Sequence, residues 1–152
     1  LELQKYRFGE RLSYQIELDD TCRMYLIPKL SLVTFVENAC VHGIERKPSP
    51  GWVFVRVYEK QGQVCLEVED TGIGMPEKFL KQMQKDVEDL NIEKIREMEH
   101  IGVSNACLRL KMSSQNTAKF LFESEEGVGS SVTVQIPAEK LRKIERSGRK
   151  KK

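Results

Sequence analysis

The stretch that decides the fold covers residues 28–43 and reads PKLSLVTFVENACVHG. After Pro28, apolar residues recur at intervals of three and four positions, which predicts a helix with one buried side. The residues that carry this spacing are Leu32, Phe35, Val36, Ala39 and Gly43. Gly43 is also the predicted stop of the helix.

The polar residues of this helix lie close together on its surface. At about 100° per residue, Glu37, Asn38 and His42 share an arc about 140° wide with Thr34 and Val41. Such an arc is ordinarily a solvated stripe. Because so little of this helix is polar, we interpret the arc as the wall of a cleft that carries a carboxylate, an amide and an imidazole.

The pattern on either side of the helix predicts strands. Leu12, Tyr14, Ile16 and Leu18 alternate with polar residues, which is the period of a half-buried strand. The other predicted elements are strands over 52–58 and 64–69, helices over 79–90 and 103–110, and strands over 120–123 and 132–136. Because adjacent antiparallel strands with inserted helices do not alternate regularly, we predict an α+β two-layer sandwich.

The composition is typical of one folded domain. The chain has 152 residues, of which 39% are apolar. Residues 139–152 hold eight Lys or Arg and two Glu, a charge of +6, whereas residues 1–138 carry 17 basic and 21 acidic residues, a charge of −4. A nucleic-acid footprint needs basic residues on one face of a domain, so we expect no nucleic-acid partner.

The cysteines and the hydropathy pattern indicate the redox state of the thiols and whether the chain contacts a membrane. Cys22, Cys40, Cys65 and Cys107 are widely spaced without a C-x-x-C pair, which is typical of reduced, buried thiols. No apolar segment is long enough to span a bilayer, so we expect no direct membrane contact by this chain. The chain begins in mid-pattern without Met, and we expect it to be a piece of a longer protein.

A second motif, Asp70-Thr71-Gly72-Ile73-Gly74, directly follows a predicted strand. Its two glycines let a backbone approach a ligand closely, and a carboxylate at a strand end can accept a hydrogen bond from an exocyclic amine. An ordinary turn has the same pattern, so both interpretations stay open. Neither G-x-x-x-x-G-K-[ST] nor G-x-G-x-x-G occurs in the chain.

Two more glycine motifs follow. Gly102 and Asn105 lie at the start of a predicted helix, whose free N–H groups and dipole favour a phosphate, although a simple helix cap has the same residues. Gly127 and Gly129 form a turn that leads into the last strand, which contains Thr133.

Taken in order, these motifs resemble the N, G1, G2 and G3 boxes of the GHKL ATPases, a superfamily that holds gyrase, MutL, heat-shock chaperones and sensor histidine kinases. Within it, residues 28–43 and the ending Asn105-x-x-x-Arg109-Leu110 resemble the LytS/YesM-like sensor histidine kinases. The residues that carry the four boxes are Glu37-Asn38-Ala39 with His42-Gly43, Asp70 to Gly74, Gly102 with Asn105, and Gly127-Val128-Gly129.

The resemblance implies a Bergerat-type fold, in which helices cover one face of a mixed, largely antiparallel sheet. ATP would lie between the N-box helix and a lid over residues 75–101. Glu37 would act as general base or polarise the reacting group, Asn38 would ligate Mg²⁺, and His42 would lie near the phosphates. Asp70 would bind the adenine amino group. The other implied nucleotide contacts are Gly72, Gly74, Gly102, Asn105, Gly127, Gly129 and Thr133.

The resemblance also implies that the protein transfers the γ-phosphoryl group of ATP to a histidine on upstream dimerisation helices, for relay to the receiver domain of a response regulator. Neither His42 nor His100 lies in the P-H-F-x-x-N context of the phosphoacceptor, so we expect no autophosphorylation by this chain alone. The implied division is the end of an upstream linker (1–10), an ATP-binding catalytic domain (11–138) and a basic tail (139–152). We expect the cytoplasmic domain of a membrane sensor that is a homodimer at full length.

The sequence departs from the family pattern at two positions. Val41 stands where a basic residue is common, and His100 replaces the first glycine of the G2 box. Thr133 lies on the strand face opposite Val132, so its role requires the cleft to open on that face. Two alternatives therefore stay open: an anti-sigma-factor-type protein serine kinase, which shares the boxes, and a degenerate nucleotide fold that serves as a docking module.

Overall fold

The predicted strands and helices are all present in the computed structural model, which describes residues 1–91 and 101–145. Short 3-10 or π segments connect several of them. In chain order the elements are α1 (Glu2–Phe8), η1 (Gly9–Arg11), β1 (Leu12–Leu18), η2 (Asp20–Met24), β2 (Tyr25–Leu26), α2 (Ser31–Asn38), η3 (Ala39–Ile44), β3 (Gly51–Lys60), β4 (Gln63–Asp70), α3 (Glu77–Glu88), α4 (Ile101–Ser113), β5 (Lys119–Glu125), β6 (Gly129–Pro137), η5 (Ala138–Lys140) and β7 (Arg142–Lys143).

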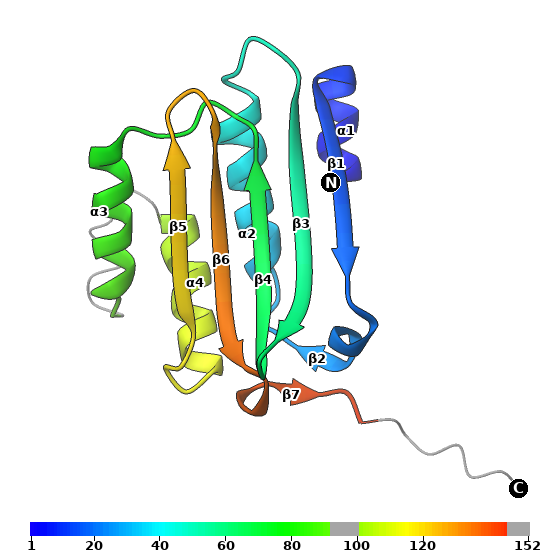
Figure 1. Cartoon of the computed structure of the whole chain (residues 1–152), viewed down its shortest axis with the longest axis vertical. Helices are drawn as coiled ribbons and strands as arrows, with labels where there is room; N and C mark the ends of the chain where they lie inside the picture. The colour runs from blue at the N-terminus through cyan, green and yellow to red at the C-terminus, as the bar shows by residue number, and fades with distance from the viewer. Residues whose placement is uncertain (92–100, 146–152) are drawn as a thin grey trace, which may run out of the picture.

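Five strands form the central sheet, in the order β1-β3-β4-β6-β5. The β1–β3 pair is parallel and the other three pairs are antiparallel. Figure 1 shows α2 and α4 against one face of this sheet, while the described part of the chain places no helix over the opposite face. The predicted α+β class and the Bergerat-type arrangement, with helices on one face of a mixed, largely antiparallel sheet, are confirmed.

The core lies between the sheet and these helices. Alternate residues of the central strands point into it, as the two-residue period of a strand requires. From the sheet the core receives Val53, Val55, Val64, Leu66, Val68, Val134 and Ile136, and from the helices Phe35, Ala39, Val103, Ala106, Cys107 and Leu110. Burial of each large apolar side chain stabilises the fold by about 1.5–3 kcal/mol, which fixes the helices on this face.

Helix α3 packs against β5 and α4, at the edge of the sheet (Figure 1). Its residues Met83 and Val87 are buried in the core. Gln84 Nε2 donates a hydrogen bond to Phe122 O at 2.9 Å, and Lys111 Nζ on α4 donates to Val87 O at 2.6 Å. The helical part of the expected lid is therefore packed into the body. Residues 92–100 of that lid, including His100, lie outside the described residues.

The β3–β4 hairpin has a turn type that the sequence left open. Gln61 has a φ of 52° and Gly62 a φ of 74°, so both central residues are left-handed. This is the requirement of a type I′ turn, whose twist matches the twist of the flanking strands.

Residues 139–145 are part of the folded body, whereas the sequence analysis placed the start of a basic tail at residue 139. Leu141 is buried in the core, and β7 forms a two-stranded antiparallel sheet with β2. Ile144 N donates a hydrogen bond to Met24 O at 2.8 Å. Strands of two residues are too short to show a hydropathy period, so the sequence gave no sign of this pair.

The cysteine prediction is confirmed, because all four thiols are free and buried. Across residues 1–91 and 101–145, no helix has both the length and the apolar content that crossing a membrane requires.

Candidate functional site

Asp70, the last residue of β4, is the buried carboxylate of the candidate site. Its side chain lies where β4 ends, beside the end of η3 and the start of β6, and the residue is only 7% exposed. Asp70 Oδ1 accepts the backbone N–H of Gly72 at 2.8 Å. In the antiparallel register, Asp70 pairs with Ser130.

Burial raises the pKa of Asp70 from 3.8 to about 6. The backbone N–H groups of Gly72 and Ser130 act against this shift, as does the positive charge of Lys47, while the Glu69 carboxylate adds to it. Asp70 is therefore ionised at neutral pH and accepts hydrogen bonds there, but at a pH only slightly below neutral it becomes protonated.

The helix predicted after Pro28 is present, but it ends differently from the prediction. The regular helix α2 stops at Asn38, and the chain continues as a π-type turn, η3, in which Glu45 N donates to Cys40 O at 2.9 Å. The predicted stop at Gly43 therefore lies inside a wider turn that reaches Ile44. The side chains of Asn38 and His42 therefore line the same cavity as Asp70.

The glycines of the motifs allow chain segments to approach one another closely. A Cβ atom on Gly43 would lie 2.6 Å from Asp70 Oδ1, and one on Gly72 would lie 2.4 Å from Gly43 Cα. Ile73 N donates to Gly43 O at 3.2 Å across this contact. A Cβ on Gly129 would lie 2.0 Å from Asp70 O, and one on Gly74, whose φ is 65°, 2.0 Å from Glu125 O. These glycines are required by packing around Asp70, so the loop is more than an ordinary turn.

Two cavities meet at Asp70, and both include Asn38, Met75 and Ser130. The inner one, of about 30 Å³, is mainly apolar. The outer one, of about 210 Å³, has His42 and Arg46 on its η3 side. The inner walls include Phe35, Ala39, Val68, Met83, Val103, Phe122 and Val132, and the outer walls His42, Gly43, Arg46, Ile73, Gly74, Pro76 and Phe79.

The structure brings most of the N-box and G1 residues together. Asn38, His42, Asp70 and Gly74 line the cavities, and Gly72 packs against Gly43 and donates its N–H to Asp70 Oδ1. Glu37 lies one residue before Asn38 but is exposed on the outer side of α2, outside both cavities.

The residues of the G2 and G3 boxes lie outside the two cavities. Gly102 begins α4 and its Cβ position is 3.6 Å from Thr34 Cγ2, and Asn105 is half-buried on the same helix. Neither lines the two cavities. Gly127, with a φ of 83°, is in the β5–β6 turn, where its N–H donates to Ile73 O at 2.6 Å. Gly129 packs on the Asp70 backbone.

Thr133 lies on the other side of the sheet from the cavities. Val134, next to it, is fully buried under the helices, and Val132 lines the inner cavity. Because side chains alternate along a strand, Thr133 points to the open face, where it pairs with Glu67 and Leu121. The cleft does not open on that face, so the structure does not bring Thr133 to the site.

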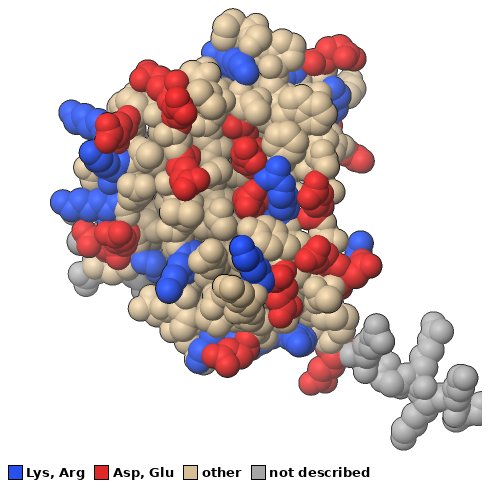
Figure 2. Space-filling model, in the orientation of Figure 1, with Lys and Arg blue, Asp and Glu red and all other residues tan. Residues whose placement is uncertain are grey.

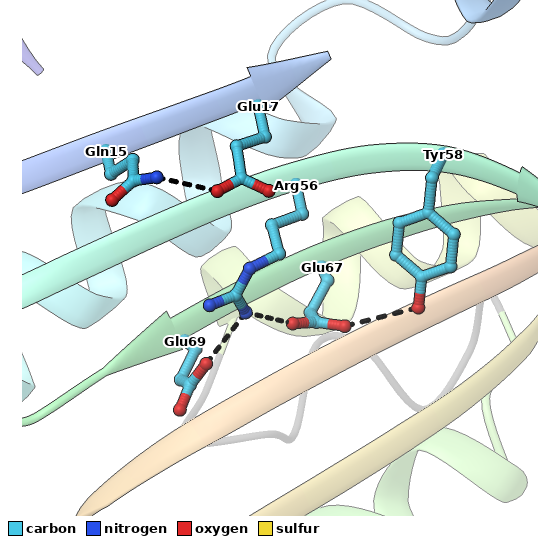
Figure 3. Close-up of polar contacts among 6 residues, drawn as sticks. All are labelled: Gln15, Glu17, Arg56, Tyr58, Glu67 and Glu69. Carbon is cyan, nitrogen blue, oxygen red and sulfur yellow. Dashed lines mark hydrogen bonds and ion pairs between the residues drawn. The ribbon is translucent and has the colours of Figure 1, made fainter. Parts of the chain in front are cut away.

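The open face carries a polar network of its own (Figure 3). Arg56 bonds both Glu67 and Glu69, the latter at 2.8 Å, and these carboxylates raise the pKa of the guanidinium. Tyr58 Oη donates to Glu67 at 3.3 Å. Figure 2 shows acidic and basic side chains interspersed over this face, with no large area of one sign. The network is separate from the two cavities.

The cavities include residues that the sequence analysis did not select, among them Ser130, Arg46, Met75 and Phe79. Two of them, Ser130 and Arg46, could have been found from their positions in the sequence. Ser130 directly follows the Gly127-Val128-Gly129 turn, and pairing the last strand antiparallel with β4 places it opposite Asp70. Arg46 lies four residues after His42, which is one helical turn.

The fold and this arrangement around Asp70 define an ATPase of the GHKL type. The family described as "Histidine kinase-, DNA gyrase B-, and HSP90-like ATPase" matches residues 29–140, and the chain belongs to this family.

Relatives within the family are sensor kinases. The chain is 28% identical over 137 residues to the sensor histidine kinase YesM of Bacillus subtilis, which covers 90% of this chain and 22% of YesM. It is 36% identical over 85 residues to the sensor protein LytS of Bacillus cereus, covering 56% of this chain and 14% of LytS. The chain thus spans about a fifth or less of the length of these relatives.

A solved structure supports the fold. The histidine kinase domain of the Erythrobacter litoralis EL346 blue-light activated histidine kinase superposes with a TM-score of 0.59 at 22% identity, over 91% of this chain and 57% of that one.

Proposed function

We propose that the chain is the ATP-binding catalytic domain of a sensor histidine kinase. It transfers the γ-phosphoryl group of Mg-ATP to a histidine on an upstream dimerisation domain, and the phosphoryl group then passes to the receiver domain of a response regulator. The observation that carries the proposal is the convergence of Asn38, His42 and Asp70 on adjoining cavities from elements that are far apart in the sequence.

The residues that line the inner cavity suit an adenine base, for which the cavity of about 30 Å³ has to widen. Asp70 is ionised at neutral pH and accepts a hydrogen bond from the exocyclic amine of the base. The apolar walls, such as Val68, Met83 and Val132, contact the faces and edges of the ring. Gly72 and Gly74 contribute by letting the loop pack behind and beside the carboxylate.

The outer cavity suits the phosphates. His42 and Arg46 supply cationic or hydrogen-bonding groups on its η3 side, so Arg46 takes the part of the basic residue that the family commonly has at the position of Val41. Gly102 and Asn105 at the start of α4, and Gly127 in the β5–β6 turn, complete the proposed phosphate side. We leave Thr133 out of this proposed set.

The donor set fits a magnesium ion that arrives with the nucleotide. Asn38 offers one amide oxygen, and the described residues hold no group of three or more His, Cys, Asp or Glu that could bind a metal. Mg²⁺ keeps several waters and is commonly held by one or two protein oxygens together with substrate phosphates. Bound through Asn38, the ion would neutralise phosphate charge during transfer.

Glu37 is the proposed general base or polarising group. It lies on the exposed side of α2, next to Asn38, where a histidine on a separate domain has access to it. General-base catalysis contributes on the order of 10² to 10⁴ in rate. Loss of Glu37 therefore reduces transfer while leaving nucleotide binding in place.

The proposal includes the setting of the domain. The acceptor histidine lies on another part of the full-length protein, so this chain alone does not autophosphorylate. The full-length protein is a homodimer, with this domain on the cytoplasmic side of a membrane and residues 1–10 as the end of the linker from the dimerisation helices.

Calorimetry with Mg-ATP tests the binding part of the proposal. We expect the wild-type chain to bind Mg-ATP, and Asp70→Asn to abolish binding because the amide presents a donor as well as an acceptor to the base. Asp19→Asn is the matched control, since Asp19 is exposed and distant in sequence from every site residue, and it should bind as the wild type does. Absence of heat with the wild type would favour a docking module instead.

A transfer assay tests the proposed transfer of the phosphoryl group to a histidine. The chain is mixed with the dimerisation domain of its full-length protein and γ-labelled ATP. We expect label on a histidine of that domain and none on His42. Label on a serine of a partner protein would point to the protein serine kinase instead.

A further inference from the structure

Lys47 connects the turn after η3 to the loop that follows Asp70. Its Nζ donates a hydrogen bond to Thr71 O at 2.7 Å. Thr71 is fixed from the other side as well, because its N–H donates to Trp52 O at 3.0 Å and its Oγ1 accepts Trp52 N at 2.9 Å. The peptide between Asp70 and Gly72 is therefore held between β3 and a lysine ammonium.

Lys47 also acts on the charge of Asp70. Its positive charge lowers the pKa of that carboxyl, against the larger effect of burial. The other charged or titratable groups near Asp70 are Glu69 on β4, Glu123 on β5, the Cys40 thiol of η3, and His42 and Arg46 on the η3 side of the cavities. Lys47 favours the ionised form of Asp70, which is the form that accepts a hydrogen bond from a base.

The segment before β1 holds Lys47 in place. Arg11, at the end of η1, donates from its NH2 group to Lys47 O at 2.6 Å and to Glu45 O at 3.3 Å. Arg7, on α1, forms an ion pair with Glu45 at 2.9 Å. Two arginines of the N-terminal segment thus bind both ends of the turn that presents Lys47.

We propose that Lys47 is a positioning residue for Asp70, and that Arg11 connects the N-terminal segment to the nucleotide loop through it. The contacts run from Arg11 to the Lys47 backbone, and from the Lys47 side chain to the Thr71 carbonyl beside Asp70. This inference rests on the proposed function in one respect, namely that Asp70 binds the nucleotide. It means that a change in the N-terminal segment alters nucleotide affinity without touching the nucleotide.

The experiment compares Lys47→Met, Lys47→Arg and Arg11→Met with the wild-type chain. Calorimetry measures Mg-ATP affinity between pH 5 and pH 8, and thermal unfolding is recorded for each variant. Lys60→Met is the matched control, because Lys60 is exposed at the end of β3 and pairs with Gln63, at the opposite end of β4 from Asp70.

We expect Lys47→Met to weaken Mg-ATP binding about 10-fold at pH 7.5, the scale of one hydrogen bond from a charged donor. The pH at which binding is half lost should also rise, because Asp70 without this cation takes up a proton at higher pH. Lys47→Arg should restore both values, and Lys60→Met should change neither. Arg11→Met should weaken binding in the same direction by a smaller factor.

Several results would overturn the inference. Wild-type affinity in Lys47→Met would do so, as would a drop in melting temperature with an unmoved pH midpoint, since that outcome describes a merely structural contact. Unchanged binding in Arg11→Met would remove the connection to the N-terminal segment. Failure of the proposed function looks different: in that case the wild-type chain itself does not bind Mg-ATP.

Discussion

At the scale of single residues, Asp70 is the group around which the site is built, because its carboxyl is buried and adjoins both cavities. Asp70 was predicted because a carboxylate follows a strand and precedes two glycines, and the structure places it in a buried position between two cavities. Thr133 was selected because the resemblance implies it as a nucleotide contact, whereas Ser130 is the residue that pairs with Asp70. Only the register between β4 and β6 distinguishes the two, and a single sequence does not contain that register.

Asp70 also gives the site a stability cost. Its pKa is about 6 in the folded chain, above the ordinary value of 3.8, so the folded chain favours the protonated carboxyl. The stabilisation that this preference contributes is fully present below pH 3.8 and is lost as pH rises through 6. A neutral amide avoids this cost. We expect Asp70→Asn to raise the free energy of unfolding at pH 7.5, by about 1 to 3 kcal/mol, while it abolishes nucleotide binding.

Urea unfolding at several pH values checks this expectation. The gain of Asp70→Asn over the wild type should shrink as pH falls and disappear near pH 4. Asp19→Asn, an exposed control, should show no comparable gain. A variant that is less stable than the wild type at pH 7.5 would show that the ionised carboxylate, through its N–H donors, supports the fold.

At the scale of elements, long periodic segments were predictable and short or irregular ones were not. The hairpin β3–β4 and the helices α2, α3 and α4 follow from the spacing of apolar residues over eight or more positions. The π-type turn η3 does not, because its wider hydrogen bonding depends on tertiary contacts of Gly43 with Asp70 and Gly72. The β2–β7 pair is too short to carry a period.

The loop after β4 makes a further prediction at this scale. Gly74 has a φ of 65° and no room for a Cβ, which would lie 2.0 Å from Glu125 O. Gly62 has a φ of 74° but no atom near its Cβ position. We expect Gly74→Ala to destabilise the fold by about 3 kcal/mol or more, because the β5–β6 turn must move. Gly62→Ala should cost only about 1 kcal/mol, the strain of a left-handed backbone.

Chemical denaturation of the two variants separates steric contact from backbone strain, because both glycines have a similar φ. Equal losses for Gly62→Ala and Gly74→Ala would mean that the loop shifts freely and that the contact with Glu125 is not a constraint on the site.

At the scale of the whole molecule, the five-stranded sheet and its helical layer were predictable as a class, because four ordered motifs resemble one superfamily. The extent of the folded body was not. Charge alone suggested a tail from residue 139, but Leu141 is buried in the core and β7 pairs with β2. One buried leucine among the five charged residues of 139–145 does not form a pattern that a sequence reveals.

The consequence is testable by truncation. A chain that ends after residue 138 loses Leu141 and the β2–β7 pair, and we expect its melting temperature to fall by about 5 °C, as the loss of about 2 kcal/mol of burial predicts. A chain that ends after residue 145 keeps both and should melt within about 1 °C of the full chain. Equal melting temperatures for the two truncated chains would show that β7 contributes nothing to stability.

Trp52 is the sole tryptophan of the chain, and its backbone exchanges two hydrogen bonds with Thr71. Its indole is 45% exposed on the open face and stacks on Phe54, with 5.6 Å between ring centroids. The protein thus has an intrinsic fluorophore whose backbone is hydrogen-bonded to the loop that follows Asp70. Emission from this one ring reports directly on movement of that loop, with no label attached and no background from a second indole.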